Sequence, residues 1–181
     1  MTRYTDDELL ALFRDGDNPN YAFNLIVRQY QEMIYWHVRR LVISHEDADD
    51  VVQDVFIKVW QSLDKFRGES GLYTWIYRIA TNEALTFLKR KKRKYLLPLV
   101  DVSRQLEETL EADVYYQGSE IEKQIQKAIL TLPEKQRAVF HLRYYDEMKY
   151  EDMAKILDTT VGALKASYHH AVKKIEKYVG S

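Results

Sequence analysis

The chain has 181 residues, of which 46% are hydrophobic and 30% are charged, and its formal net charge is −1. The apolar fraction excludes a chain that is disordered throughout, and the absence of cysteine excludes both a disulfide framework and a thiolate metal site. Six glycines and three prolines indicate long helices with few turns.

The N-terminal segment predicts two helices. Thr5 and Glu8 have the spacing of a capping box, which opens a short helix that ends near Gly16. Apolar residues then recur at helical intervals over residues 21–43. This second helix is long and amphipathic, so we expect one of its sides to face the core.

A third helix, a polar loop and a fourth helix are expected next. Ser44 is a suitable N-cap, and the acidic residues after it favour the first turn of a helix. Residues 64–71 carry charge and glycine, which predicts a loop. A further helix covers about residues 72–93, and six consecutive basic residues, 89–94, lie at its end.

The C-terminal half predicts a linker and a second domain. Residues 95–119 contain Pro98 and many acids, which is typical of a linker that is partly helical. Helical spacing resumes near Glu120, and no segment alternates as a strand does. The sequence therefore predicts an all-α chain with two small helical domains, residues 1–94 and 120–181, joined by residues 95–119. The expected helices of the second domain cover residues 121–132, 133–145, 150–157 and 161–179.

Residues 150–174 have the pattern of a helix-turn-helix. Ala154 is small where two helices cross, and Thr160 can cap the last helix and direct its first turn into a DNA major groove. An ordinary helical hairpin is the alternative. The positions of the last helix that we expect to be exposed, and so able to reach bases or phosphates, are Val161, Lys165, Ser167, His169, His170 and Lys173.

Residues 62–94 combine aromatic rings with cations, the two kinds of group that hold unpaired bases and their phosphates. The alternative is a solvated helix with Trp75 in the core, although one face of an indole can pack while the other stays exposed. One side of the helix carries a polar-to-basic stripe, in which Asn82 could hydrogen-bond a base. The stripe consists of Arg78, Asn82, Thr86, Lys89 and Arg93.

An acidic cluster precedes this region and places Asp47, Asp50, Asp54 and Lys58 near one side of their helix. A metal site is not favoured, because no histidine joins the cluster at ligand spacing and no glycine-rich calcium loop is present. A solvated face and a protein-docking face remain the two interpretations.

The sequence predicts no enzyme, no cofactor, no metal and no small-molecule substrate. A phosphate-binding glycine loop, a nucleophile motif and a zinc motif are all missing from it. His37 lies on the apolar side of its helix, as core histidines do, and His169 and His170 point about 100° apart. No apolar run approaches the roughly 20 residues of a membrane span, and the start lacks a signal-peptide pattern. We therefore expect a cytoplasmic protein without direct membrane insertion.

Three stretches together resemble one family. They are DADDVVQDVFIKVW (47–60), TWIYRIATNEA (74–84) and LPEKQRAVFHLRYYDEMKYEDMAKIL (132–157). In this order and at this spacing they resemble the extracytoplasmic-function (ECF) sigma factors of the sigma-70 family, over about residues 21–178. The resemblance implies a factor that binds core RNA polymerase, directs it to specific promoters and promotes DNA melting for transcription initiation.

The resemblance implies roles for the first domain, sigma-70 region 2. The acidic helix is similar to the family's docking surface for the clamp helices of the polymerase β′ subunit, which implies contacts by Asp47, Asp50, Gln53, Asp54, Phe56, Lys58 and Trp60. The loop and the helix after it are similar to the elements that capture a flipped base of the −10 element and melt it. The residues implied there are Lys65, Phe66, Arg67, Tyr73, Trp75, Arg78, Asn82, Lys89, Arg90 and Arg93.

The resemblance also implies roles for the second domain, sigma-70 region 4. Its helix-turn-helix is similar to the family's −35 reader, and residues 133–145 would meet the polymerase β flap. The implied DNA contacts are Arg137, Thr160, Val161, Lys165, Ser167, His169, His170 and Lys173. An inhibitory anti-sigma factor is a further expected partner, and the linker would thread toward the RNA exit and active-site channels.

Four positions depart from the family pattern. Asp158 replaces a usual glycine, Thr159 an apolar residue, Ser167 a frequent arginine and Lys149 a common serine cap. Asp tolerates left-handed backbone geometry better than most residues, so the turn is expected to form. The departures leave the −35 sequence unpredicted.

The main alternative is a stand-alone helix-turn-helix regulator, which would bind promoter duplex without polymerase. An adaptor that uses only the acidic helix would not need the basic run, and a nuclease would need carboxylates beside it. The basic residues 89–94 and the acidic residues 101–122 also predict a compact arrangement in which opposite charges hold the two domains together.

Overall fold

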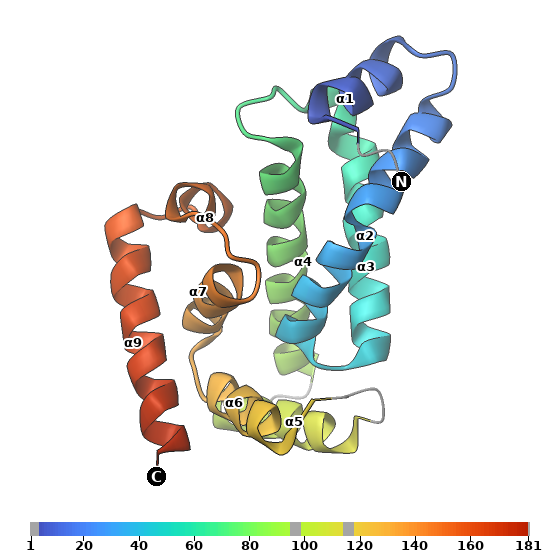
Figure 1. Cartoon of the computed structure of the whole chain (residues 1–181). Coiled ribbons are helices and arrows are strands. Elements are labelled where there is room, and N and C mark those ends of the chain that lie inside the picture. Colours follow the sequence, from blue (N-terminus) through green and yellow to red (C-terminus); the bar gives the residue numbers. More distant parts are fainter. Residues whose placement is uncertain (1–3, 95–98, 114–117, 181) are drawn as a thin grey trace.

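The computed structural model describes residues 4–94, 99–113 and 118–180, and these ranges contain helices and no strand (Figure 1). The N-terminal helices form a bundle, α5 follows it, and the C-terminal helices form a second, smaller group. The elements are α1 (Asp6–Asp15), α2 (Pro19–Val42), α3 (His45–Ser62), a 3-10 turn (Leu63–Lys65), α4 (Leu72–Lys94), α5 (Leu99–Ala112), α6 (Glu120–Leu130), α7 (Glu134–Tyr144), α8 (Tyr150–Leu157) and α9 (Val161–Val179). The all-α prediction is confirmed.

Side chains define where several helices begin. The predicted capping box is present, since the Thr5 hydroxyl accepts from the Glu8 N–H at 3.3 Å and the Glu8 carboxylate accepts from the Thr5 N–H at 2.7 Å. Ser44 accepts from the Asp47 N–H at 3.3 Å, as its N-cap position predicted. A second capping box at Ser119, which the sequence analysis missed, starts α6 at the expected place.

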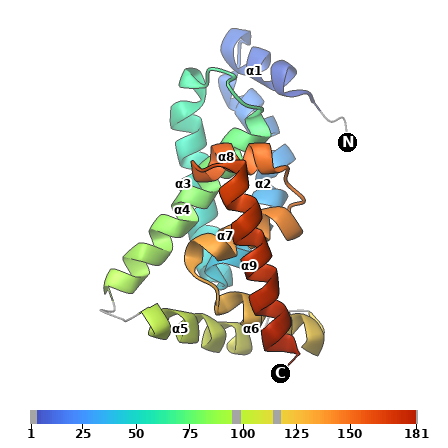
Figure 2. The same ribbon diagram turned by 90° about the vertical axis from the view of Figure 1, so that its left-hand side faces the viewer.

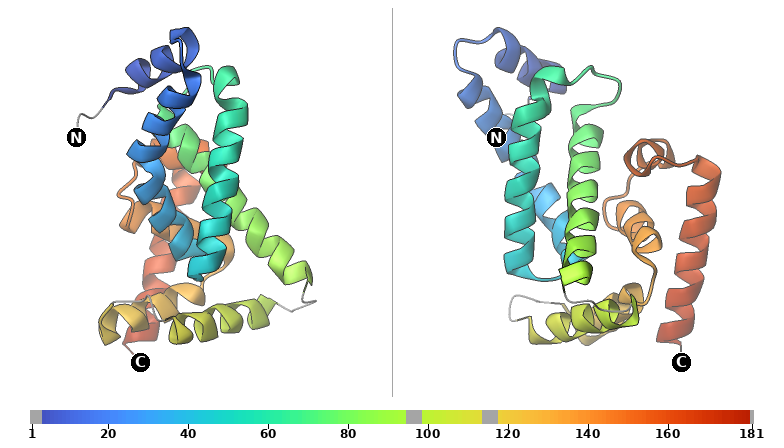
Figure 3. Two further views of the ribbon diagram at one scale, coloured as in Figure 1. Left: turned by 90° about the vertical axis from the view of Figure 1, so that its right-hand side faces the viewer. Right: turned by 180° about the vertical axis from the view of Figure 1, so that it is seen from behind.

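The bundle packs α2, α3 and α4 side by side, while α1 crosses the end where α3 passes into the loop before α4 (Figure 3). Ile26 and Ile34 of α2, Val55 of α3 and Ile76 of α4 are inaccessible to solvent. Apolar residues at helical spacing therefore supply this core, as their periodicity predicted.

The second domain contains the predicted helix-turn-helix, formed by α8 and α9. Asp158 has φ 49° and ψ 57°. It therefore adopts the left-handed conformation expected at this turn, where the family usually has glycine. Thr160 caps α9 by accepting from the Ala163 N–H at 3.2 Å. Pro133 differs from expectation, since it is the N-cap of α7 and not its first helical residue.

The linker contains α5, which lies with α6 at the end of the bundle opposite α1 (Figure 1). Leu106 and Leu110 of α5 are buried, so this helix packs against the protein. Acidic residues of this region pair with Arg39 and Lys127, through Asp113 and Glu111, whereas Lys91 of the basic block pairs with Asp47 of α3 at 2.7 Å.

The two domains pack against each other. Figure 2 shows the C-terminal helices over the bundle, and the most extensive contacts between the domains are those of α8 with α4 and of α7 with α2. One continuous apolar cluster includes Ile34 and Ile76 of the bundle together with Leu142 and Met153 of the second domain. The compact arrangement therefore depends on apolar burial as well as on charge.

Candidate nucleic-acid interface

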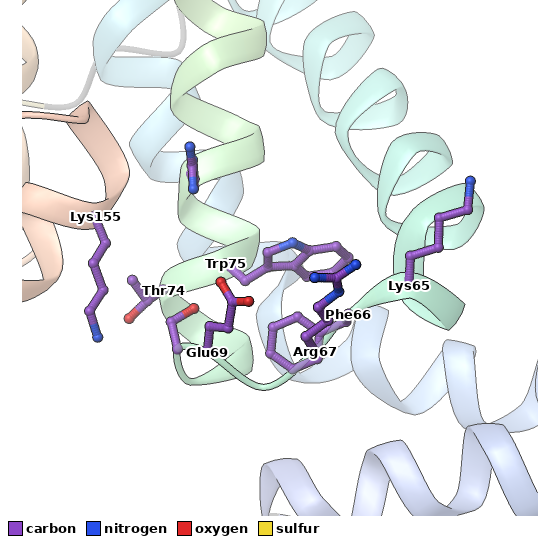
Figure 4. A pocket seen from close by; sticks show the side chains of 9 residues that line it. Lys65, Phe66, Arg67, Glu69, Thr74, Trp75 and Lys155 are labelled. Atoms are coloured by element: carbon purple, nitrogen blue, oxygen red, sulfur yellow. The ribbon is translucent and has the colours of Figure 1, made fainter.

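A cavity of about 520 Å³ lies where the loop before α4 meets the first turns of that helix (Figure 4). Its walls are both aromatic and cationic, and they come mainly from the predicted loop. The lining residues are Lys65, Phe66, Arg67, Glu69, Ser70, Thr74, Trp75, Arg78 and Lys155. Lys155 comes from α8, so the second domain borders the cavity in this arrangement.

Two rings form the apolar part of the cavity. The Phe66 and Trp75 centroids are 4.9 Å apart and the ring planes are inclined by 46°. Phe66 is only 7% exposed, whereas Trp75 is partly exposed. Trp75 therefore presents a surface on which a base could stack. Phe66 packs beneath the indole and supports it, whereas the family resemblance had implied that Phe66 itself contacts the −10 element.

The polar-to-basic stripe continues from this cavity along α4. Arg78, Asn82, Lys89 and Arg93 are all exposed on the helix, as predicted. Their spacing keeps them on one side, so a strand whose base entered the cavity could run along these cations. Thr86, between them, is partly buried.

Tyr73 lies elsewhere. Its ring packs against that of Tyr77 with a centroid separation of 4.5 Å and an inclination of 41°, and burial together with Asp146 and Asp152 raises the pKa of the Tyr73 hydroxyl. Residues two apart on a helix point about 200° apart, so Tyr73 faces the second domain while Trp75 faces the loop. The role of Tyr73 at the −10 element therefore stays a prediction.

A second cavity of about 670 Å³ lies between α3 and the basic end of α4. The exposed acids Asp50 and Asp54 and the exposed Gln53 line its α3 side, and Arg90 lines its α4 side. Within the described parts of the chain no group of His, Asp or Glu side chains could hold a metal ion. The exposed carboxylates of α3 therefore lie across this cavity from the cations Arg90, Lys91 and Lys94 of α4.

The other residues predicted for docking are placed differently. Lys58 is exposed and pairs with Glu83 at 2.5 Å. Trp60 is 39% exposed and packs edge-on against Phe13 and Phe23. Phe56 is only 8% exposed, because its position on α3 faces the core of the bundle, so it cannot present its ring to a partner.

The helix-turn-helix exposes most of the predicted DNA contacts. Lys165, His169, His170 and Lys173 of α9 are exposed, as is Thr160, while Val161 and Ser167 are partly exposed. Arg137 is the exception. It is 2% exposed and burial lowers its pKa to about 10, because α7 lies between α2 and α9. This arrangement does not present Arg137 to DNA.

A buried polar cluster at the contact between the domains was not foreseen. Asp146, in the loop after α7, accepts from Arg40 at 2.5 Å and from Tyr77 at 3.5 Å, and its carboxylate also lies 2.9 Å from His37. His37 is fully buried, as predicted, but its role as an interdomain contact had no signal in the sequence. His141 lies nearby with both ring nitrogens buried.

Known structures show the same fold. The sigma factor RpoE from Bartonella quintana, solved in complex with the anti-sigma factor NepR, matches with a TM-score of 0.68 at 21% identity, over 87% of this chain and 96% of that chain. CnrH in complex with the cytosolic domain of CnrY matches with a TM-score of 0.70 at 22% identity, over 97% of both chains. None of the described helices is long and apolar enough to span a bilayer.

Sequence relatives identify the family. Residues 26–94 match Sigma-70 region 2, and residues 122–175 match Sigma-70, region 4. The ECF RNA polymerase sigma-E factor of Haemophilus influenzae is 34% identical, over 97% of this chain and 95% of the relative. The sigma-E factor of Escherichia coli K12 is 35% identical, over 97% and 94%. These matches favour a polymerase specificity factor over a stand-alone regulator, and the chain belongs to the ECF sigma factors of the sigma-70 family.

Proposed function

We propose that this sigma factor opens promoters by capturing one flipped base of the −10 element in the cavity beside Trp75. As an ECF sigma factor the chain binds core RNA polymerase and directs it to promoters, so the proposal concerns which residues perform each step. The observation that supports it is the cavity itself, which joins a partly exposed indole to the cations Lys65, Arg67 and Arg78.

The energetics favour capture of a single base. Unstacking duplex DNA costs about 1.4 kcal/mol per base-pair step. Stacking of one base on an aromatic side chain returns about 1–3 kcal/mol. The cavity can therefore offset the opening of one or two pairs, and the polymerase has to supply the rest.

The domains divide the work in this proposal. Residues 1–94 would act as region 2, residues 95–119 as the linker and residues 120–181 as region 4. The exposed α4 stripe would follow the melted strand, with Arg90 near its end, and α9 would read the −35 element in the major groove. The α9 contacts proposed are Thr160, Val161, Lys165, Ser167, His169, His170 and Lys173.

The acidic face of α3 is the proposed polymerase-docking surface. Asp50, Gln53 and Asp54 are exposed there, and Trp60 adds a partly exposed ring near the end of the helix. Such a face fits a basic surface, which the family resemblance assigns to the β′ clamp helices, while α7 would meet the β flap. We also propose that the protein acts in the cytoplasm, by binding and without catalysis of its own.

A protein inhibitor is the remaining proposed partner. The two structural relatives were each solved with a second protein, the anti-sigma factor NepR in one case and the cytosolic domain of CnrY in the other. By analogy we propose that an anti-sigma factor binds this chain and controls its access to polymerase.

Transcription with purified components tests the proposal. Run-off transcription on genomic fragments with core polymerase first maps the promoters. Permanganate reactivity of unpaired thymines then measures opening by holoenzymes with Trp75→Ala, Asn82→Ala or, as a control on the exposed α1–α2 turn, Asp17→Ala. We expect both α4 variants to reduce opening roughly tenfold or more while polymerase binding is unchanged. Normal opening by both would contradict the assignment.

A further inference from the structure

We propose that α1 positions the base-capture loop, through Asp6 at one end of the loop and Arg14 at the other. This inference rests on the proposed function of the cavity beside Trp75. The region 2 match begins only at residue 26, so α1 lies outside it. The helix crosses the bundle at the end where the loop joins α3 to α4 (Figure 1).

Asp6 fixes the C-terminal end of the loop. One oxygen of its carboxylate accepts from the Leu72 N–H at 2.7 Å, and the other accepts from the Tyr30 hydroxyl at 2.8 Å. Leu72 is the first residue of α4, and its N–H belongs to the first turn, where a helix has no acceptors of its own. Asp6 therefore caps α4 from a different helix, and its negative charge suits the positive end of the α4 dipole.

Arg14 fixes the N-terminal end of the loop. Its guanidinium donates to the Phe66 carbonyl at 2.5 Å, across 52 residues of chain. Phe66 follows the turn that ends α3 and carries the ring that supports Trp75. The contact therefore holds the backbone at the point that sets the position of the indole.

The loop between these two contacts lacks comparable support. Arg67 and Glu69 are exposed, and Gly68 has φ +72° with no other heavy atom within 4 Å of where a Cβ would lie. Glycine adopts this positive φ without a steric penalty, and here it forms an open loop tip. The two α1 contacts consequently determine the span and direction of the loop between Phe66 and Leu72, which has few contacts of its own.

α1 is itself rigidly held. Leu9, Leu10 and Phe13 are buried, and Gln29 donates to the Tyr4 carbonyl at 3.2 Å just before the helix. Phe13 also packs edge-on against Trp60 at 5.6 Å. A loop whose two ends are bound to a rigid helix is ordered before the flipped nucleotide base binds. The entropy cost of ordering the loop during capture is therefore smaller.

Fork-junction DNA with either the natural base or an abasic site tests this inference. Abasic sites are first placed through the −10 element of a mapped promoter, and wild-type holoenzyme affinity identifies the captured position. The measured quantity is the holoenzyme's affinity for DNA with the natural base divided by its affinity for DNA with an abasic site at that position. The Trp75→Ala holoenzyme gives the ratio expected when capture is lost. We expect Asp6→Ala and Arg14→Ala to lower this ratio about tenfold, the effect of one hydrogen bond to a charged group, with unchanged affinity for abasic DNA.

Two controls separate positioning from general stability. Asp7→Ala removes an exposed acid from the same first turn of α1, and Arg14→Lys keeps a cation that can donate to the carbonyl. Both should retain the wild-type ratio. Arg14 is exposed, so Arg14→Ala carries the test if Asp6→Ala does not fold.

The outcomes are distinct. Loss of discrimination in the Arg14→Ala holoenzyme, with wild-type unfolding temperature, supports the inference. If wild type discriminates and Trp75→Ala does not, while both α1 variants match wild type, the inference is overturned and the proposed function stands. If wild type itself shows no preference at any position, the capture role fails and the inference fails with it.

Discussion

The Asp146 carboxylate lies 2.9 Å from Nδ1 of His37, in a contact that joins the second domain to α2 across 109 residues of chain. The Asp146 side chain is only 4% exposed and also accepts from Arg40. His37 in turn contacts the Thr81 hydroxyl through Nε2 at 2.9 Å. This buried acid therefore holds the two domains together in a specific orientation.

Asp146→Ala should loosen the contact between the domains. Removing one partner of a buried ion pair leaves the other charge unpaired, at a cost of about 3–5 kcal/mol. Small-angle scattering should give the wild type a radius of gyration of about 16 Å, the value expected for a compact chain of this length, and the variant a larger one. Glu151→Gln, at an exposed position of α8, is the control. Identical scattering from Asp146→Ala and wild type would show that apolar packing alone suffices.

Stability should fall as the pH decreases from 7 to 5. His141 is buried, and its desolvation, with Arg40, Arg137 and His37 adding positive charge, holds its pKa well below the ordinary value. The unfolded chain then binds a proton below about pH 6.5 that the folded chain does not bind, so the free energy of unfolding decreases by up to about 1.4 kcal/mol per pH unit.

Urea unfolding at a series of pH values measures this slope. His141→Leu should reduce it, whereas His169→Ala, on the exposed face of α9, should not. The carboxylates of Glu8 and Glu122 do not interfere, because hydrogen bonds to Thr5 and Ser119 lower their pKa below 4.5. An unchanged slope in His141→Leu would refute the assignment.

Charge reversal at Asp50 and Asp54 should weaken the binding of core polymerase. Both acids are exposed on α3, so Asp50→Lys with Asp54→Lys leaves the core of the bundle intact. Like charges placed across an interface oppose association, and we expect the dissociation constant to rise roughly tenfold or more. Fluorescence anisotropy of labelled protein measures it. Asp17→Lys is the matched control, and normal holoenzyme formation by the double variant would exclude α3 as the docking face.

Lys165→Ala should weaken the binding of −35 DNA by the holoenzyme. Lys165 is exposed near the start of α9, where a recognition helix meets DNA. If Lys165 contacts a phosphate, its removal should lower the affinity by a similar factor for different −35 sequences. The slope of log affinity against log salt concentration should then decrease in magnitude by about 1. Lys177→Ala, in the last turn of α9, should behave as wild type. An unchanged salt dependence of DNA binding in Lys165→Ala would show that Lys165 does not contact the DNA backbone.

Local rules explain why much of the fold could be read from the sequence. The capping box at Thr5, the N-cap at Ser44 and the left-handed Asp158 each depend on neighbouring residues only, and all three were predicted. The same holds for the exposure of Asn82 and Lys165, since helical periodicity fixes which side of a helix a residue occupies.

Errors arose where burial depends on a distant element. Arg137 and Phe56 were expected to contact partners, but packing between helices covers them.

The sequence by itself determined most of the helices, the caps at Thr5, Ser44 and Thr160, the two-domain order and the family, because each follows from local spacing and residue type. Only the tertiary structure decided that Asp6 caps α4, that Arg14 holds the Phe66 carbonyl and that Asp146 meets His37. These contacts join residues 52 to 109 positions apart. No periodicity encodes such pairs, since they exist only after apolar burial has brought the helices together.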